Sequence, residues 1–268
     1  MRWRVGPLVA LNVLLSWQAV AEGAEGVSTA QKAAQVSQSA LGQALPDLAF
    51  TRIDGRMVKL SEYRGKPLLV TLVYTSCVDV CPTLIENLYP AVAEARRTLG
   101  PDSFSVITVG FDVGKDTPQR MRAFASAHGA DLPNWAFLSA DEENLDRLAR
   151  SVGFAYYGRA GTWDHLAQVS VIDADGRLRQ QIYGAVFEPP LIVEPLKSLV
   201  FGRDLPLASL GSLIDRVKFF CTVYDPSSGR YYFNYSLFLN IAIGFLCFGR
   251  VLGMLMQEWR RGSGSRPS

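Results

Sequence analysis

Runs of apolar residues with strand-like and helix-like spacing divide the middle of the chain into a regular series of elements. Residues 47–60 predict a hairpin that turns at Asp54-Gly55. Beyond it, continuous or alternating apolar positions predict strands, and apolar positions three and four apart predict helices. The predicted strands are 68–74, 104–111, 135–138, 165–172 and 177–183, and the predicted helices are 82–99, 117–128, 142–152 and 189–200. A β-α-β half is therefore followed by a β-β-α half.

A further apolar stretch lies at the N-terminal end of the chain. Arg2 and Arg4 precede a mostly apolar run that ends in Ala19-Val20-Ala21. This is the pattern of a secretory signal peptide, which we expect at residues 1–21. The alternative is an uncleaved anchor helix, but the run is short and polar residues interrupt it.

Residues 235–256 form a second apolar stretch of about 22 residues, long enough to span a bilayer. Arg250 interrupts it, so a buried or interfacial helix is the alternative. Trp259 and several arginines follow, and such a pattern marks the cytoplasmic side. We therefore expect an inner-membrane protein with a single C-terminal span, a periplasmic main domain and a cytoplasmic tail at 257–268. A mitochondrial intermembrane space also agrees with this arrangement.

Composition divides the rest of the chain and excludes one class of partner. Residues 22–44 are rich in Ala, Ser, Gln and Gly and predict a linker, either a tether or a weakly helical leader. Residues 45–204 hold the predicted elements of one folded domain, and residues 205–234 form a juxtamembrane segment. The net charge is +2, and no cluster of Lys and Arg alternates with aromatic residues. Nucleic acid is therefore not an expected partner.

Cys77 and Cys81 lie where the predicted strand 68–74 passes into the helix predicted from Pro82. Their spacing is expected to place both thiols on one face of the first helical turns, with Cβ atoms about 5–6 Å apart. The positive end of the helix dipole favours thiolates there. The pair can form a disulfide or bind a soft metal. With these cysteines, the element order predicts an α/β, thioredoxin-like domain.

The sequence contains two histidines, His128 and His165. His128 ends a predicted helix, where a surface capping role is expected. His165 begins the predicted strand 165–172 and follows a loop. Taken alone it would be a hydrogen-bonded loop residue, but the cysteine pair makes it a candidate metal ligand.

Four segments, in order, carry a resemblance to a known family. They are Gly65-Lys-Pro67 through Cys77-x-x-x-Cys81-Pro82, Asp112-x-x-x-Asp116-Thr-Pro118, Asp164-His165, and Ile172-Asp-Ala-Asp-Gly176. Over residues 45–202 the chain resembles the Sco (SenC) family of copper-binding, thioredoxin-fold cytochrome c oxidase assembly proteins.

The resemblance implies that Cys77, Cys81 and His165 bind one copper ion per chain, as Cu(I), Cu(II) or both. Thiolates suit Cu(I), and a neutral imidazole suits either copper state. The family's aspartate-bearing loop corresponds to Asp112 and Asp116 here, and either could contact and orient the ligands.

Asp116 and Asp164 each have a structural alternative. Asp116-Thr-Pro118 is a good start for a helix, with Asp116 as the N-cap. Asp164 could orient His165 through a hydrogen bond or could simply be a turn residue.

The sequence therefore favours a membrane-tethered periplasmic copper chaperone, which is not an enzyme. By resemblance, its partner is a copper-accepting oxidase subunit with a CuA site. The alternative is a thiol-disulfide oxidoreductase with Cys77 as the attacking thiolate and Cys81 as the resolving thiol, which reduces client cysteines before metallation. A thioredoxin-fold peroxidase is a weaker third reading. A homodimer through the spanning helix stays open.

Two further cysteines fall outside the proposed site. Cys221 lies in the juxtamembrane segment and is the unpaired thiol if Cys77 and Cys81 act together. A small buried apolar role is expected for it. Cys247 lies in the predicted spanning helix, where it would face lipid or pack.

Overall fold

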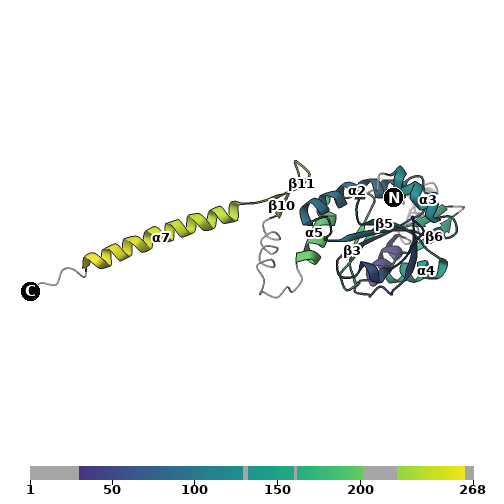
Figure 1. Cartoon of the computed structure of the whole chain (residues 1–268), viewed down its shortest axis with the longest axis horizontal. Helices are drawn as coiled ribbons and strands as arrows, with labels where there is room; N and C mark the ends of the chain where they lie inside the picture. The colour runs from purple at the N-terminus through teal and green to yellow at the C-terminus, as the bar shows by residue number, and fades with distance from the viewer. Residues whose placement is uncertain (1–29, 129–131, 160–161, 202–221, 263–268) are drawn as a thin grey trace, which may run out of the picture. The chain divides into compact units, whose positions relative to one another are not determined.

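The computed structural model describes residues 30–128, 132–159, 162–201 and 222–262 (Figure 1). The chain divides into two compact units, Met1–Arg203 and Asp204–Ser268. The predicted signal peptide and Cys221 lie outside the described residues.

A seven-stranded mixed sheet forms the centre of the first unit (Figure 1). Its central strands β3, β4 and β5 are parallel, and the other pairs are antiparallel. The strand order is β2-β1-β5-β4-β3-β8-β9. The bounds are β1 Ala49–Arg52, β2 Met57–Lys59, β3 Leu68–Val73, β4 Ser105–Gly110, β5 Trp135–Ser139, β8 Gln168–Ile172 and β9 Leu178–Tyr183.

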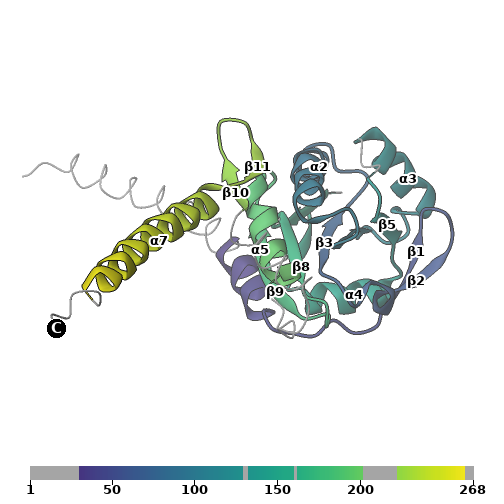
Figure 2. The same ribbon diagram turned by 60° about the vertical axis from the view of Figure 1, so that its left-hand side comes forward.

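Every residue of β3 and β4 is buried. Parallel strands covered on both faces need apolar side chains at successive positions, which explains their nearly continuous apolar sequence. The helices of this unit are the 3-10 helix η1 Leu60–Tyr63, α2 Val80–Leu99, α3 Pro118–Ala127, α4 Glu142–Ser151 and α5 Pro189–Phe201. Helices α2 and α5 pack side by side (Figure 2). The predicted α/β, thioredoxin-like class is confirmed.

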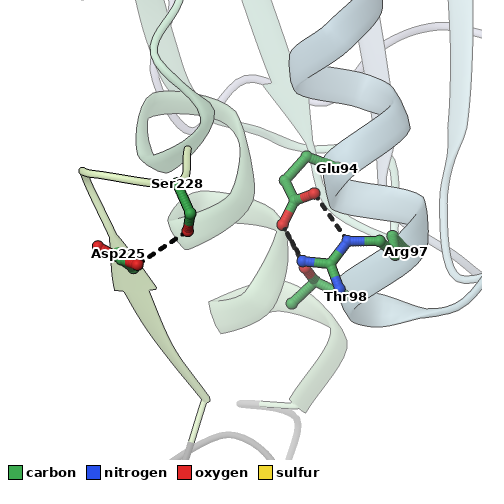
Figure 3. A network of polar contacts seen from close by, with 5 residues as sticks. All are labelled: Glu94, Arg97, Thr98, Asp225 and Ser228. Atoms are coloured by element: carbon green, nitrogen blue, oxygen red, sulfur yellow. Dashed lines mark hydrogen bonds and ion pairs between the residues drawn. The ribbon is translucent and has the colours of Figure 1, made fainter. Parts of the chain in front are cut away.

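Helix α2 holds its last turns together with a local polar network. The Glu94 carboxylate accepts hydrogen bonds from Arg97 Nε at 2.8 Å and from Thr98 Oγ1 at 3.4 Å (Figure 3). Residues three and four apart meet on a helix surface, so this network stabilises the helix locally.

Residues 30–44, within the predicted tether or weakly helical leader, pack against the folded unit. Residues 30–39 are helical, and Ser37 in this helix donates a hydrogen bond to Gln168 Oε1 at 3.0 Å. Because Gly153 has no side chain, the backbone of helix 30–39 can lie close to it. A Cβ atom at Gly153 would lie 2.6 Å from the Val36 carbonyl oxygen, and its φ is +61°. The sequence did not predict this packing, because the residues that Ser37 and Val36 contact come together only when the sheet has folded.

Two other local predictions need correction. Helix α2 begins at Val80, two residues before the predicted start. The predicted strand 165–172 is divided: β7 Thr162–His165 pairs with β6 Tyr156–Arg159 as a separate hairpin, and β8 begins at Gln168.

The second unit contains a hairpin and one long helix. Strands β10 Thr222–Asp225 and β11 Arg230–Phe233 are antiparallel. Asp225 organises their turn by accepting a hydrogen bond from Ser228 Oγ at 2.9 Å (Figure 3). Helix α7 spans Ser236–Gly262. Its segment Phe238–Gln257 has a mean hydropathy of 1.9 and is not buried, so it is long and apolar enough to cross a membrane.

Candidate metal centre

Cys77 lies in the loop between β3 and α2, before the helix begins, and not in a helical turn as its spacing predicted. Asp79 is the N-cap residue of α2, but its side chain makes no capping hydrogen bond. Cys77 Sγ instead accepts a hydrogen bond from the Cys81 backbone N–H at 3.3 Å. One of the unpaired N–H groups at the helix start thus stabilises the Cys77 sulfur.

The two thiols differ sharply in their surroundings. Cys81 is 1% exposed, whereas Cys77 is half-buried. Burial raises the pKa of the Cys81 thiol well above its ordinary value. For Cys77, burial acts in the same direction, but hydrogen bonds from the backbone N–H groups of Cys81 and Asp79 overcome it and lower its pKa. Cys77 is therefore the more accessible and more readily ionised thiol.

His165 reaches the cysteines from a distant part of the chain. It is the last residue of β7, and its Nε2 lies 3.8 Å from Cys81 Sγ. Its ring packs against aromatic rings, with centroids 5.2 Å from Phe111 and 5.4 Å from Phe154. The first strand-to-helix turn and the β6–β7 hairpin therefore bring the Cys81 sulfur and the His165 imidazole together, while Cys77 Sγ contacts the Cys81 backbone.

The surroundings of His165 favour the neutral imidazole, which is the form that binds metals. Burial lowers its pKa below the ordinary value of 6.5. Nδ1 is buried and has no hydrogen-bond partner within the described part of the chain. Asp164 is exposed. The predicted hydrogen bond by which Asp164 would orient His165 is therefore not formed.

Asp116 is a buried carboxylate that joins two loops at this edge of the sheet. Its Oδ1 accepts hydrogen bonds from the Thr75 backbone N–H and hydroxyl, and its Oδ2 accepts one from the Asp112 backbone N–H at 2.8 Å. Burial raises the pKa of Asp116, although these donors act against the rise. Gly110 provides the space, since a Cβ atom there would lie 2.5 Å from Asp116 Cβ.

The helix-start prediction for Asp116 is therefore wrong by one residue. Thr117 is the N-cap of α3, and its side chain accepts a hydrogen bond from the Arg120 N–H, with Pro118 as the first helical residue. Asp112 is also buried, and its Oδ2 lies 3.1 Å from Lys115 Nζ. The side chain of Asp112 thus forms an ion pair within its own loop.

Tyr74 is a residue of this site that sequence reasoning missed. It ends the buried run that begins with β3, and its ring centroid is 6.1 Å from that of His165. Burial, and then the adjacent Cys77 thiol, raise the pKa of Tyr74 to about 12. An aromatic residue three positions before the first cysteine was the only available signal.

The donor set suits a soft metal ion, although the ligands are not yet closed around one point. Within the described ranges, no three Cys, His, Asp or Glu side chains form a ready-made metal cluster. The sulfur-to-nitrogen distance of 3.8 Å between Cys81 and His165 is nevertheless suitable. Bonds of the length found for zinc, about 2.3 Å to sulfur and about 2.0 Å to nitrogen, place the two ligand atoms roughly 3.7 Å apart at a trigonal angle.

The remaining sequence candidates lie in other environments. His128 caps the C-terminal end of α3, as predicted, and its Nδ1 is 2.9 Å from Glu86 Oε1 on α2. Cys247 is an exposed free thiol on α7.

Comparison with known proteins agrees with this fold. The chain matches the family model described as SCO1/SenC over residues 38–200. It is 25% identical over 92 residues to the SCO1 protein homolog of Bacillus subtilis (strain 168), covering 34% of this chain and 46% of that protein. It is 24% identical over 163 residues to the mitochondrial protein SCO2 homolog of Bos taurus, covering 61% and 59%. The matched segments thus span about half the length of these relatives.

Solved structures show the same architecture. A putative electron transfer protein from Aquifex aeolicus VF5 superimposes with a TM-score of 0.56 and 26% identity, over 62% of this chain and 97% of that one. The copper-bound ScoI of Arabidopsis thaliana superimposes with a TM-score of 0.51 and 18% identity, over 57% and 98%, a likeness that shows the fold alone.

Proposed function

Because this chain belongs to the SCO1/SenC family, we propose that it is a copper chaperone in which Cys77, Cys81 and His165 hold the metal. The observation that carries this proposal is the approach of His165 Nε2 to within 3.8 Å of Cys81 Sγ. A histidine 84 residues further along the chain has no local reason to meet that sulfur. Two thiolates and a neutral imidazole form a donor set suited to Cu(I).

The residues around the site favour the metal-binding protonation state of two of the three proposed ligands. The lowered pKa of Cys77 favours its thiolate, and the lowered pKa of His165 keeps a free ring nitrogen. Cys81 has a raised pKa, so its proton must leave as copper binds. Rotation of the half-buried Cys77 side chain would complete the three-ligand set.

Copper would be passed on by ligand exchange. The acceptor's thiols and imidazoles displace Cys77, Cys81 and His165 one after another, so that the metal is never released to water. A site that borders on solvent allows this exchange, and a closed four-ligand site would oppose it. The proposed acceptor is the CuA centre of a haem–copper oxidase.

The chain ends indicate where this exchange takes place. The predicted signal peptide would export the main domain, and α7, whose segment Phe238–Gln257 is apolar enough to cross a membrane, would tether it. The arginines after Trp259 support a cytoplasmic C-terminus and, with it, a periplasmic copper site.

Copper binding by paired histidine variants tests the site. The full chain, solubilised in detergent and reduced without oxygen, is titrated with one equivalent of Cu(I) against a Cu(I) chelator. His165→Ala is expected to lower the copper affinity at least about tenfold, by analogy with other lost metal ligands and their supports. His128→Ala is the matched control and is expected to bind like the parent. Equal affinity of His165→Ala and the parent would refute the three-ligand site.

The difference between the two thiols favours a second candidate function. A half-buried cysteine with a lowered pKa, next to a buried cysteine with a raised one, is the arrangement of an attacking and a resolving thiol. The chain would then reduce a client disulfide: Cys77 forms a mixed disulfide, and Cys81 displaces the client thiol as the Cys77–Cys81 disulfide forms.

Trapping experiments distinguish this second function. The Cys81→Ser variant should accumulate a mixed disulfide with an oxidised dithiol peptide, and Cys77→Ser should not. Such activity should survive in His165→Ala. Failure to trap any adduct through Cys77 would exclude the oxidoreductase.

A further inference from the structure

Four valines project into solvent around the proposed copper site. Val78 is 95% exposed and Val186 is 69% exposed, while Val113 and Val80 are 41% and 37% exposed. We call these four residues the valine rim. Full exposure of a valine side chain forgoes about 1.5 kcal/mol or more of burial free energy. Val78 loses nearly all of this and Val186 much of it, so their position near one site needs an explanation.

Three separate chain segments bring the residues of the valine rim to the same end of the sheet, where β3 and β4 terminate. Val78 and Val80 lie between the two cysteines, Val78 in the loop after Cys77 and Val80 as the first residue of α2. Val113 lies in the loop after β4, and β3 and β4 end side by side because Val73 pairs with Gly110. The Asp116 carboxylate also bonds this loop to Thr75.

Val186 reaches the site from the far side. It lies in the loop after β9, where the Gly184 N–H donates a hydrogen bond to the Ala167 carbonyl at 2.9 Å. Ala167 is two residues beyond His165. The valine rim therefore borders the cysteines on one side and the histidine on the other.

Other exposed apolar residues in the described part of the first unit include Tyr157 on the β6–β7 hairpin and residues that lie away from the site. Leu41, for example, is 41% exposed, but it precedes Gly42, whose N–H bonds the Leu178 carbonyl at the start of β9. The start of β9 lies beside the end of β8, because Leu178 pairs with Ile172, and Ile172 pairs with Leu68 at the start of β3. Leu41 therefore lies at the opposite end of the strands from the valine rim. Single exposed apolar residues are ordinary, whereas apolar residues grouped around a site mark a contact surface.

We propose that the valine rim is the docking surface for the protein that accepts copper. The inference rests on the proposed function and adds the kind of partner: a folded polypeptide that presents thiol or imidazole ligands within an apolar surround. Ligand exchange requires the acceptor's atoms to reach bonding distance of the copper held by Cys77. Because Val78 is the next residue, any protein that approaches so closely must cover it.

Two other occupants are less suited to this surface. A second copy of the chain placed face to face would cover both copper sites and prevent transfer. A lipid surface offers no ligand that could take the metal. An acceptor protein gains apolar burial while it aligns its ligands, and it excludes water from the exchanging copper.

The test compares a protein acceptor with a small one. The detergent-solubilised full chain is loaded with one equivalent of Cu(I) and mixed with the reduced, copper-free CuA domain of a haem–copper oxidase subunit II. A parallel reaction uses bathocuproine disulfonate, a small chelator that needs no docking surface. The variants are Val78→Ser/Val186→Ser, the single change Val113→Ser, and the matched control Leu41→Ser.

The double variant is expected to transfer copper to the CuA domain about tenfold more slowly than the parent, the loss typical of apolar contacts at an interface centre. Val113→Ser should slow transfer in the same direction. Transfer to the chelator should be unchanged in all variants, and Leu41→Ser should match the parent with both acceptors. This pattern would show that the rim acts by docking and leaves the copper site intact.

The contrary results separate the two proposals. Equal transfer to the CuA domain by the parent and by the rim variants would overturn the docking surface alone. A parent dimer that becomes monomeric in the double variant without slower transfer would assign the rim to a second copy, and would also overturn it. A parent that binds copper but yields none to the CuA domain would refute the chaperone function itself.

Discussion

The Asp116 carboxylate accepts two hydrogen bonds from Thr75, one from the backbone N–H at 2.8 Å and one from the hydroxyl at 2.7 Å. Thr75 is two residues before Cys77, and Asp116 is 41 residues further along the chain. This contact fixes the start of the cysteine loop against the end of β4, next to the aromatic residues that pack on His165. Asp116 therefore positions the proposed ligands without being one of them.

Loss of the hydrogen bonds between Asp116 and Thr75 should lower both the stability of the fold and the copper affinity of the site. Asp116→Ala leaves the N–H groups of Thr75 and Asp112 without their acceptor, and we expect the free energy of unfolding to fall by about 2–4 kcal/mol. Chemical denaturation measures this loss, and Cu(I) affinity should fall with it. Asp141→Ala removes the N-cap of α4. It should cost only about 1 kcal/mol and leave copper binding unchanged. Equal effects of the two variants would contradict the positioning role.

The two thiols of the copper-free, reduced protein should react at very different rates. Iodoacetamide should modify Cys77 first, with a pH midpoint below the ordinary thiol value of 9.0, while buried Cys81 should react only on unfolding. Mass spectrometry of the alkylated peptides from pH 6 to 10 gives both rates.

A Cys81→Ser variant provides the control for this experiment. The backbone N–H of residue 81 remains, so Cys77 should keep its reactivity. A midpoint that rises to the ordinary value in Cys81→Ser would assign the activation to the second sulfur instead of the backbone.

The stability of the copper-free protein should depend on His165 in mildly acidic solution. Burial holds the folded pKa of His165 below 6.5, so the unfolded chain takes up the proton first as the pH falls. The contribution of the neutral, buried ring is complete above pH 6.5, is lost as the pH falls from there through the folded pKa, and levels off below it. Urea unfolding between pH 7.5 and 5 should show this loss in the parent.

The two histidine positions separate this effect from general acid sensitivity. His165→Gln should reduce the pH dependence, and His128→Gln should retain it. Identical slopes in the parent and in His165→Gln would show that the ring is not buried in its neutral form.

Helix 30–39 should depend on the glycine beneath it. Gly153→Ala places a Cβ atom within 2.6 Å of the Val36 carbonyl oxygen, and we expect a loss of about 2–3 kcal/mol from backbone strain and the clash together. Limited proteolysis should then cut within residues 30–44. Gly55→Ala has a similar positive φ but open space around it, so it should cost about 1 kcal/mol without new cleavage. Resistance of the Gly153 variant would show that these residues are not packed as described.

Local sequence determined the elements whose pattern is self-contained. The strands β3 and β4 are buried on both faces, so their apolar residues run together in the sequence. The Cys77–Cys81 spacing and the adjacent helix are also local, and the family resemblance added His165 as a ligand. The length and apolarity of 235–256 likewise depend on nothing outside that segment.

Only the tertiary structure decided which distant groups meet. The contact between Cys81 and His165 arises because β6 and β7 form a hairpin of their own, and the sequence pattern of this hairpin merged with that of β8. Asp116 matched the local pattern of a helix N-cap, but the buried donors of Thr75 compete for its carboxylate, and Thr117 caps the helix. Residues 30–39 looked like a linker because their packing depends on Gly153, which has no sequence signal linking it to them. Interactions within one turn or strand can be read from neighbouring residues, whereas long-range ones depend on a surface that exists only after folding.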